Sequence, residues 1–326
     1  MKNRRTLISL AIAGALLAGI APAQAKTWRI GFVPKLIGIP YFNAMKEGLD
    51  KGGTAFGAKI VYQGPTTASV SGQAEIAQGM INHHLDAVGV SANSPTALEV
   101  QAKRAQKAGI LFYSSDSQVA GDAVSLRVSQ ASDQGIGFAC ADQVAEQIGG
   151  KGDIALVSGG PTATNLNVWI GYIKQRIAQK YPDIKIVSIQ YAGEDISKAT
   201  DLTAQLLSAY PHLKGIIGVN STAVPGAAQA VLKAGLSGKV AVTGVTDPNT
   251  IRSYVNDGTV KSVVLWNPID LGYLTVWGVV QLLEHKPLQA ENNVPNLGTI
   301  SYDATTKTLL LGKPLIIDKS NISLNF

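Results

Sequence analysis

The stretch that decides the fold class is Trp28-Arg29-Ile30-Gly31-Phe32-Val33, together with the helical pattern that follows it over residues 40–56. The first segment is short and mostly apolar, and it does not alternate with polar residues. The second places Phe42, Met45 and Leu49 at helical spacing. Non-alternating short strands that are each followed by a helix are typical of a parallel sheet covered by helices on both faces.

The same unit recurs outward along the 326-residue chain almost without a break. The pattern predicts strands over residues 28–33, 59–62, 87–91, 110–113, 124–128, 153–157, 184–190, 215–219, 240–244 and 260–265. It predicts helices over residues 40–56, 71–82, 96–108, 134–148, 165–180, 196–210, 223–234, 248–256 and 269 to about 285. The tail resembles a hairpin, with strands over 308–311 and 314–317 around Gly312-Lys313.

Two serial sets of such units predict an α/β protein with two doubly wound, Rossmann-like lobes. We expect the N-terminal lobe to comprise residues 26–128 with the tail 268–326, and the C-terminal lobe to comprise residues 129–267. The late helix and the tail would return to the first lobe, so several strands would cross between lobes and form a hinge. Ligands in open α/β sheets bind at the carboxyl ends of strands, which predicts one cleft between the lobes.

Residues 1–25 have the composition of a secretory signal peptide. Lys2, Arg4 and Arg5 precede an apolar run over 7–20, and Ala23-Gln24-Ala25 supplies the small-x-small pattern of a cleavage site. The apolar run is too short for a stable membrane anchor, which is the alternative. We therefore expect an exported, periplasmic protein that begins near Lys26.

Charge and cysteine content exclude two classes of function. Three of the 28 basic residues lie in the predicted signal, which leaves 25 against 22 acidic residues and no basic cluster for nucleic acid. The single cysteine, Cys140, cannot form an internal disulfide, and its apolar helical surroundings predict a buried, inert thiol.

Motifs for catalysis and for cofactors are absent from the sequence. It contains no Gly-x-Gly-x-x-Gly turn, Walker loop, Gly-x-Ser-x-Gly elbow or histidine pair at metal-ligand spacing. We expect no cofactor, no metal and no enzymatic activity, with a hydrolase as the remote alternative.

Polar residues do follow seven of the predicted strands, and together they would line the cleft. Carboxylates, amides and hydroxyls there suit the hydroxyl groups of a sugar, and nearby aromatic rings can pack on its C–H faces. Each polar residue could instead cap a helix, and the aromatic rings could belong to the core. The candidates are Lys35, Ser91, Asp116, Asn165, Ser221, Asp247 and Asn267, with the rings of Tyr41, Phe42, Trp169 and Trp266.

Eight segments spread over nearly the whole region after residue 25 carry a family resemblance. They are FVPKLIG at 32–38, YQGPT at 62–66, SVSGQ at 69–73, VSANSP at 90–95, PTATNLNVW at 161–169, VPGAAQA at 224–230, RSYV at 252–255 and GTVK at 258–261. With these segments the chain resembles the autoinducer-2-binding (LsrB-like) family and the related rhamnose- and ribose-type binding proteins. This resemblance implies a class I periplasmic binding fold, a membrane permease of an ABC importer as partner, and no catalysis. A chemoreceptor or membrane sensor is an alternative partner, and we expect a monomer.

The resemblance also assigns ligand contacts. Positions that match Lys35 and Asp116 contact ligand in the autoinducer-2 binders, and both residues are present here. Asn165-Leu166 stands where that family has Asp-Gln, which adds an apolar side chain. Two family contacts align with Val219 and Ser221, and Asp247 occupies a position that is acidic in many sugar binders. These departures favour a neutral monosaccharide, deoxysugar or polyol with one apolar edge, and autoinducer-2 is the alternative ligand.

Overall fold

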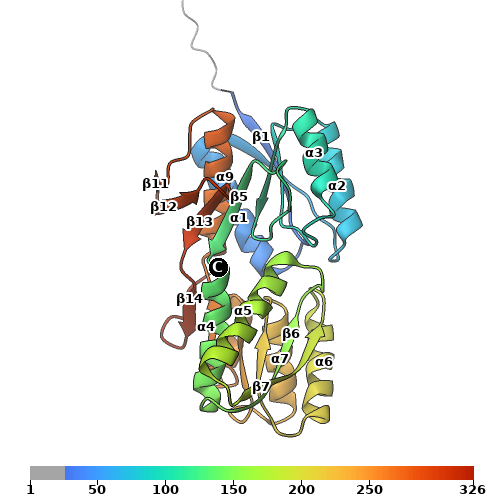
Figure 1. Cartoon of the computed structure of the whole chain (residues 1–326), viewed down its shortest axis with the longest axis vertical. Helices are drawn as coiled ribbons and strands as arrows, with labels where there is room; N and C mark the ends of the chain where they lie inside the picture. Colours follow the sequence, from blue (N-terminus) through green and yellow to red (C-terminus); the bar gives the residue numbers. More distant parts are fainter. Residues whose placement is uncertain (1–25) are drawn as a thin grey trace, which may run out of the picture.

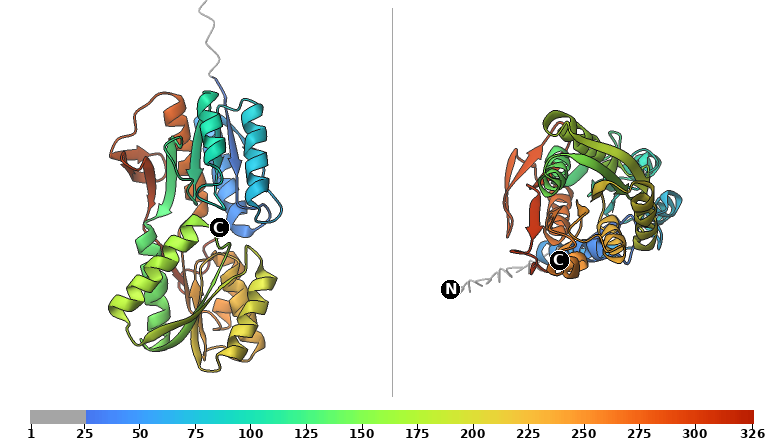
Figure 2. Two further views of the ribbon diagram at one scale, coloured as in Figure 1. Left: turned by 45° about the vertical axis from the view of Figure 1, so that its right-hand side comes forward. Right: turned by 90° about the horizontal axis from the view of Figure 1, so that it is seen from below.

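The computed structural model describes residues 26–326, and the predicted signal peptide lies outside the described residues. Two α/β halves are stacked along the long axis of the molecule (Figures 1 and 2). The C-terminal segment returns to the half that contains β1 (Trp28–Val33), where helix α9 (Pro268–Leu283) and three of the four strands of the segment lie beside the N-terminal elements (Figure 1). The predicted class, two doubly wound sheets joined by several chain crossings, is confirmed. Within residues 26–326, no helix has the length and apolar character needed to span a bilayer.

The first sheet has the strand order β11-β12-β13-β5-β4-β3-β1-β2, and its strands from β13 to β2 pair in parallel. Its first strand and first helix have the bounds that the sequence predicts. The bounds are β1 Trp28–Val33, β2 Ala58–Tyr62, β3 Ala87–Val90, β4 Leu111–Ser115, β5 Leu126–Ala131, β11 Glu291–Val294, β12 Gly298–Asp303 and β13 Thr308–Gly312, with helices α1 Pro40–Phe56, α2 Val70–Asn82, α3 Glu99–Lys107 and α9 Pro268–Leu283.

The second sheet is parallel throughout, in the order β7-β6-β8-β9. Strands β6, β8 and β9 are mostly buried, whereas the edge strand β7 is mostly half-buried. The bounds are β6 Gly152–Ser158, β7 Ile184–Tyr191, β8 Leu213–Gly218 and β9 Ala241–Gly244, with helices α4 Asp133–Ile148, α5 Thr164–Lys180, α6 Ile196–Ala209, α7 Ala223–Lys233 and α8 Pro248–Asn256.

The predicted tail hairpin is wrong. Strand β13 joins the first sheet in parallel with β5, whereas β14 (Leu315–Asp318) pairs antiparallel with β10 (Ser262–Leu265) in a separate two-stranded sheet. The two tail strands therefore find different partners, and the turn between them carries the chain from one sheet to another. The hairpins of this region lie earlier, because β12 pairs antiparallel with both β11 and β13, and the sequence analysis missed β11 and β12.

Helices α1 and α9 pack backbone to backbone at two glycines. A Cβ atom on Gly48 would lie 1.9 Å from the carbonyl oxygen of Ile269, and one on Gly272 would lie 2.2 Å from the carbonyl oxygen of Met45. Neither position has space for a side chain. Because Tyr41 and Phe42 begin α1, this close contact also fixes the helix that carries two of the candidate rings.

The predicted burial of Cys140 is confirmed. Its side chain lies on α4 with 1% of its surface exposed, and burial raises the pKa of the thiol to about 12. A thiol that stays protonated is neither a nucleophile nor a metal ligand.

Candidate functional site

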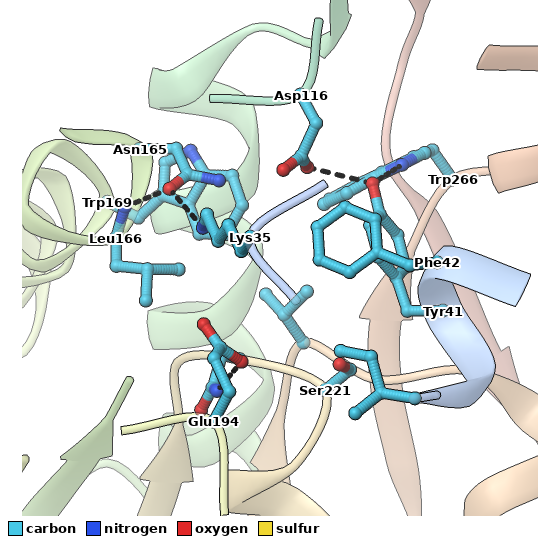
Figure 3. Close-up of a pocket in the computed structure, with 13 residues that line it drawn as sticks. Lys35, Tyr41, Phe42, Asp116, Asn165, Leu166, Trp169, Glu194, Ser221 and Trp266 are labelled. Atoms are coloured by element: carbon cyan, nitrogen blue, oxygen red, sulfur yellow. Dashed lines mark hydrogen bonds between the residues drawn. The ribbon is translucent and has the colours of Figure 1, made fainter. Parts of the chain in front are cut away.

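A cavity of about 30 Å³ lies between the two sheets, at the carboxyl ends of their strands (Figure 3). Nine of the thirteen predicted residues line it. The lining residues are Lys35, Ile39, Tyr41, Phe42, Asp116, Asn165, Leu166, Trp169, Glu194, Asn220, Ser221, Val245 and Trp266.

Both carboxylate oxygens of Asp116 are held by hydrogen bonds. Asp116 follows β4 with a left-handed backbone (φ 71°), a conformation that aspartate tolerates better than most residues. Its Oδ1 accepts a hydrogen bond from the Tyr41 hydroxyl (2.8 Å), and its Oδ2 accepts one from Ser91 Oγ (2.5 Å). Trp266 Nε1 donates to the Tyr41 oxygen in turn (3.1 Å). The carboxylate is thus oriented in advance, with further acceptor capacity for a ligand.

Lys35 joins the two halves across the cavity. Its Nζ donates to Asn165 Oδ1 at 3.0 Å, and the side chains of Lys35 and Asn165 are both almost fully buried. Thr162 Oγ1 also donates to the carbonyl oxygen of Asn93 (2.8 Å), from the second half to the first. The loop after β1 therefore contacts the first turn of α5, and the loop after β3 contacts the loop after β6.

Aromatic rings form one wall of the cavity (Figure 3). The Trp266 ring meets those of Tyr41 and Trp169 edge to face, with centroids 5.9 and 5.7 Å apart, and Phe42 packs on Tyr41 at 5.1 Å. Trp169 Nε1 is held by Asp133 Oδ1 (2.7 Å). Burial, and then the neighbouring Asp116 carboxylate, raise the pKa of Tyr41, so its hydroxyl remains a donor. These rings belong to the core and also face the cavity.

Glu194 and Asn220 also line the cavity. Asn220 belongs to the polar run 220–222 that follows the strand predicted over 215–219, whereas Glu194 is absent from the sequence-based candidates. Glu194 follows β7 and is half-buried, and its Oε2 accepts a hydrogen bond from Asn220 Nδ2 (2.6 Å). Burial raises the pKa of the Glu194 carboxyl, and the positive charge of Lys35 opposes this shift. A polar residue just past a strand is the signal used for the other candidates, and applying it to the strand over 184–190 would have found Glu194.

Four predicted residues do not line the cavity. Ser91 lies behind Asp116, and Val219 is buried beside its lining neighbour Asn220. Asp247 caps α8 by accepting a hydrogen bond from Thr250 N (2.8 Å). Asn267 caps α9 by accepting from Ile269 N (2.9 Å). For the last two, the structure favours the capping alternative.

Asp247 offers a test of this assignment. Replacing it with alanine is expected to lower the free energy of unfolding by about 1 kcal/mol, the usual effect of losing an N-cap side chain. Ligand affinity should change less than twofold, because Asp247 does not line the cavity. Urea denaturation and calorimetric titration measure the two quantities, and a tenfold loss of affinity at unchanged stability would return Asp247 to the site.

The site contains the groups needed for binding a polyhydroxylated molecule. Hydroxyl groups can donate to the carboxylates and accept from Lys35, while C–H faces can pack on the rings. Within the described part of the chain, no cluster of three or more histidine, cysteine, aspartate or glutamate residues could hold a metal ion.

Comparisons with known proteins agree with this geometry. A family model described as a periplasmic binding protein domain matches residues 30–287. The D-allose-binding periplasmic protein of Escherichia coli K12 is 27% identical over 274 residues, 80% of this chain and 85% of its own length. An ABC transporter solute-binding protein from Clostridium phytofermentas, solved with bound L-rhamnose, is 29% identical with a TM-score of 0.86, covering 92% of this chain and 98% of its own. LsrB from Clostridium saccharobutylicum, solved with AI-2, has the same TM-score at 24% identity, covers 91% of this chain and 100% of its own, and shares the fold.

Proposed function

This chain belongs to the periplasmic binding protein family, and we propose that it is the solute-binding component of an ABC importer for a neutral monosaccharide, deoxysugar or polyol. The observation that carries the proposal is the cavity between the sheets, where Asp116 and Lys35 face a wall of aromatic rings. Relatives named for D-allose and solved with L-rhamnose support a sugar as the ligand.

The energies of such contacts are sufficient for transport. A micromolar site needs about 8 kcal/mol of binding free energy. Neutral hydrogen bonds contribute about 1 kcal/mol each, and bonds to charged groups about 1.5–3 kcal/mol. Asp116, Lys35, two or three amide or hydroxyl contacts and one aromatic face reach that total.

The proposal includes the setting in which the protein works. It acts in the periplasm after removal of residues 1–25, as a monomer that delivers its ligand to a membrane permease. Its lobes comprise residues 26–128 with 268–326, and residues 129–267, which move about the crossings between the sheets. Docking on a chemoreceptor or membrane sensor is a further role compatible with the same fold.

Autoinducer-2 is the second candidate ligand. Lys35 and Asp116, which match its ligand contacts in the resembling family, both line the cavity. Leu166 also lines it and presents methyl groups where that family has a glutamine amide. Because leucine lacks the hydrogen-bonding amide of glutamine, a sugar or polyol with an apolar edge matches this cavity better than autoinducer-2 does.

A thermal-shift screen tests the function. Pentoses, hexoses, 6-deoxyhexoses, polyols and autoinducer-2 are added singly to the purified protein. A ligand that binds only the folded state at about 100 times its dissociation constant should raise the melting temperature by several degrees. A shift with one sugar or polyol supports the proposal. A shift with autoinducer-2 alone would favour the second candidate, and turnover of a ligand would contradict a binding role.

A further inference from the structure

Two carboxylates approach the cavity from opposite sides (Figure 3). Asp116 follows β4 of the first sheet, and Glu194 follows β7 of the second. A ligand bound between the sheets therefore meets an acidic hydrogen-bond acceptor on each side.

Glu194 is held so that one oxygen stays available. Asn220 Nδ2 donates to its Oε2 at 2.6 Å, and no group among residues 26–326 donates to its Oε1. Because an ionised carboxylate cannot donate, the amide of Asn220 must turn its NH₂ group toward Glu194. This orientation leaves the buried Asn220 Oδ1 without a partner among the described residues, which is costly for folding. Asn220 thus acts as a positioning residue for the carboxylate.

The loop that carries Glu194 is built around a glycine of the neighbouring loop. Gly193 N donates to the carbonyl oxygen of Gly159 at 3.2 Å. A Cβ atom on Gly159 would lie 2.8 Å from Glu194 Oε1 and 2.7 Å from Leu166 Cδ1. The glycine therefore leaves space in which the carboxylate and the apolar Leu166 side chain lie next to each other at one end of the cavity.

The charges of the lining do not balance. Asp116 and Glu194 stand against the single ammonium group of Lys35, and the other lining residues are neutral. Lys35 already donates to Asn165. An anionic ligand would bring a further negative charge into a partly desolvated site with two carboxylates, where repulsion between like charges is strong.

We infer that Glu194, positioned by Asn220, accepts a hydrogen bond from a ligand hydroxyl, and that the cavity selects an uncharged sugar or polyol with a free hydroxyl at this end over sugar acids and sugar phosphates. The inference rests on the proposed sugar-binding function. It assigns the second sheet a determinant of specificity opposite Asp116.

Titration calorimetry on the purified protein tests this. The probes are D-allose, L-rhamnose and D-arabinose, the singly deoxygenated analogues of whichever binds best, D-glucuronate and D-ribose 5-phosphate. Glu194→Gln keeps the shape of the side chain and removes its charge, and Glu146→Gln on the exposed face of α4 is the matched control. Glu194→Gln should lower the affinity for the best neutral sugar about tenfold, as expected for losing a hydrogen bond to a charged group. Glu146→Gln should leave the affinity within twofold.

Two further measurements separate a ligand contact from a structural role. One deoxy analogue should bind the wild type about tenfold more weakly than the parent sugar does. The Glu194→Gln variant should bind this analogue and the parent sugar with nearly the same affinity. Asn220→Ala alone should weaken binding of the sugar. In a protein that already carries Glu194→Gln, adding Asn220→Ala should weaken binding by less than a further twofold. D-Glucuronate and D-ribose 5-phosphate should bind at least tenfold more weakly than the best neutral sugar.

The outcomes distinguish the inference from the function on which it rests. If a neutral sugar binds tightly and Glu194→Gln changes its affinity by less than twofold, the inference is overturned and the proposed function stays intact. If D-glucuronate binds as tightly as the best neutral sugar, the inferred selectivity of the cavity against charged ligands is overturned. If no neutral sugar binds the wild type, both the proposed function and the inference fail.

Discussion

Replacing Asp116 with alanine is expected to raise the dissociation constant of the bound sugar about 30- to 150-fold, a loss of about 2–3 kcal/mol. The carboxylate is buried, is oriented by Tyr41 and Ser91, and lines the cavity. Its removal deletes a charge-assisted acceptor for the ligand and leaves the Tyr41 hydroxyl without its acceptor. Titration calorimetry with the best sugar from the thermal screen measures the change.

The matched control is Asp122→Ala, in the same half of the molecule. Asp122 is exposed and does not line the cavity, so its loss should leave the affinity unchanged. The melting temperature of each ligand-free variant separates a loss of binding from a loss of folding. A change of less than threefold for Asp116→Ala would remove Asp116 from the binding site.

The second large effect is on stability. Gly272→Ala should lower the free energy of unfolding by about 3 kcal/mol, because the added methyl group would meet main-chain atoms and not flexible side chains. The new Cβ would lie 2.2 Å from the carbonyl oxygen of Met45 and 2.7 Å from the amide nitrogen of Leu49. Helices α1 and α9 would have to separate. Urea denaturation measures the loss.

Gly79→Ala controls for the intrinsic effect of alanine in a helix. Gly79 lies within α2, and a Cβ atom there would meet no atom within 4 Å. This substitution should therefore stabilise the protein by up to about 1 kcal/mol. A loss below 1 kcal/mol for Gly272→Ala would mean that the two helices repack at little cost.

The sequence predicted the repeating part of the fold well because each unit carries its own signals. Strand β1 is a mostly apolar run, and α1 begins at Pro40 and ends before Gly57, where the backbone is left-handed. The tail lacked such signals. Strand β11, Glu291-Asn292-Asn293-Val294, is mostly polar, and β12, the neighbouring partner of β13, was not predicted. The other partner of β13 and the partner of β14 lie far away in sequence, so the turn between β13 and β14 was mistaken for a hairpin.

The sequence pattern also predicted most residues of the candidate site, but it did not predict which polar residues cap a helix instead. Carboxyl ends of parallel strands converge, which brought Lys35, Asp116 and Asn165 together as expected. Whether a polar residue after a strand faces the cavity or turns back onto the next helix depends on the backbone of the loop. Asp247 turned back to cap α8, and sequence spacing does not encode that choice.

The burial of Cys140 makes this protein suitable for thiol-specific labelling. Maleimide reagents need an accessible thiolate, and the only native thiol has neither accessibility nor a low pKa. A cysteine introduced at Ile37, after β1, or at Val168, on α5, would occupy a position that is 38% or 37% exposed, one in each half of the molecule. A dye at either position would report ligand capture by fluorescence, and a pair of dyes would report the distance between the halves in single molecules, without first removing a native cysteine.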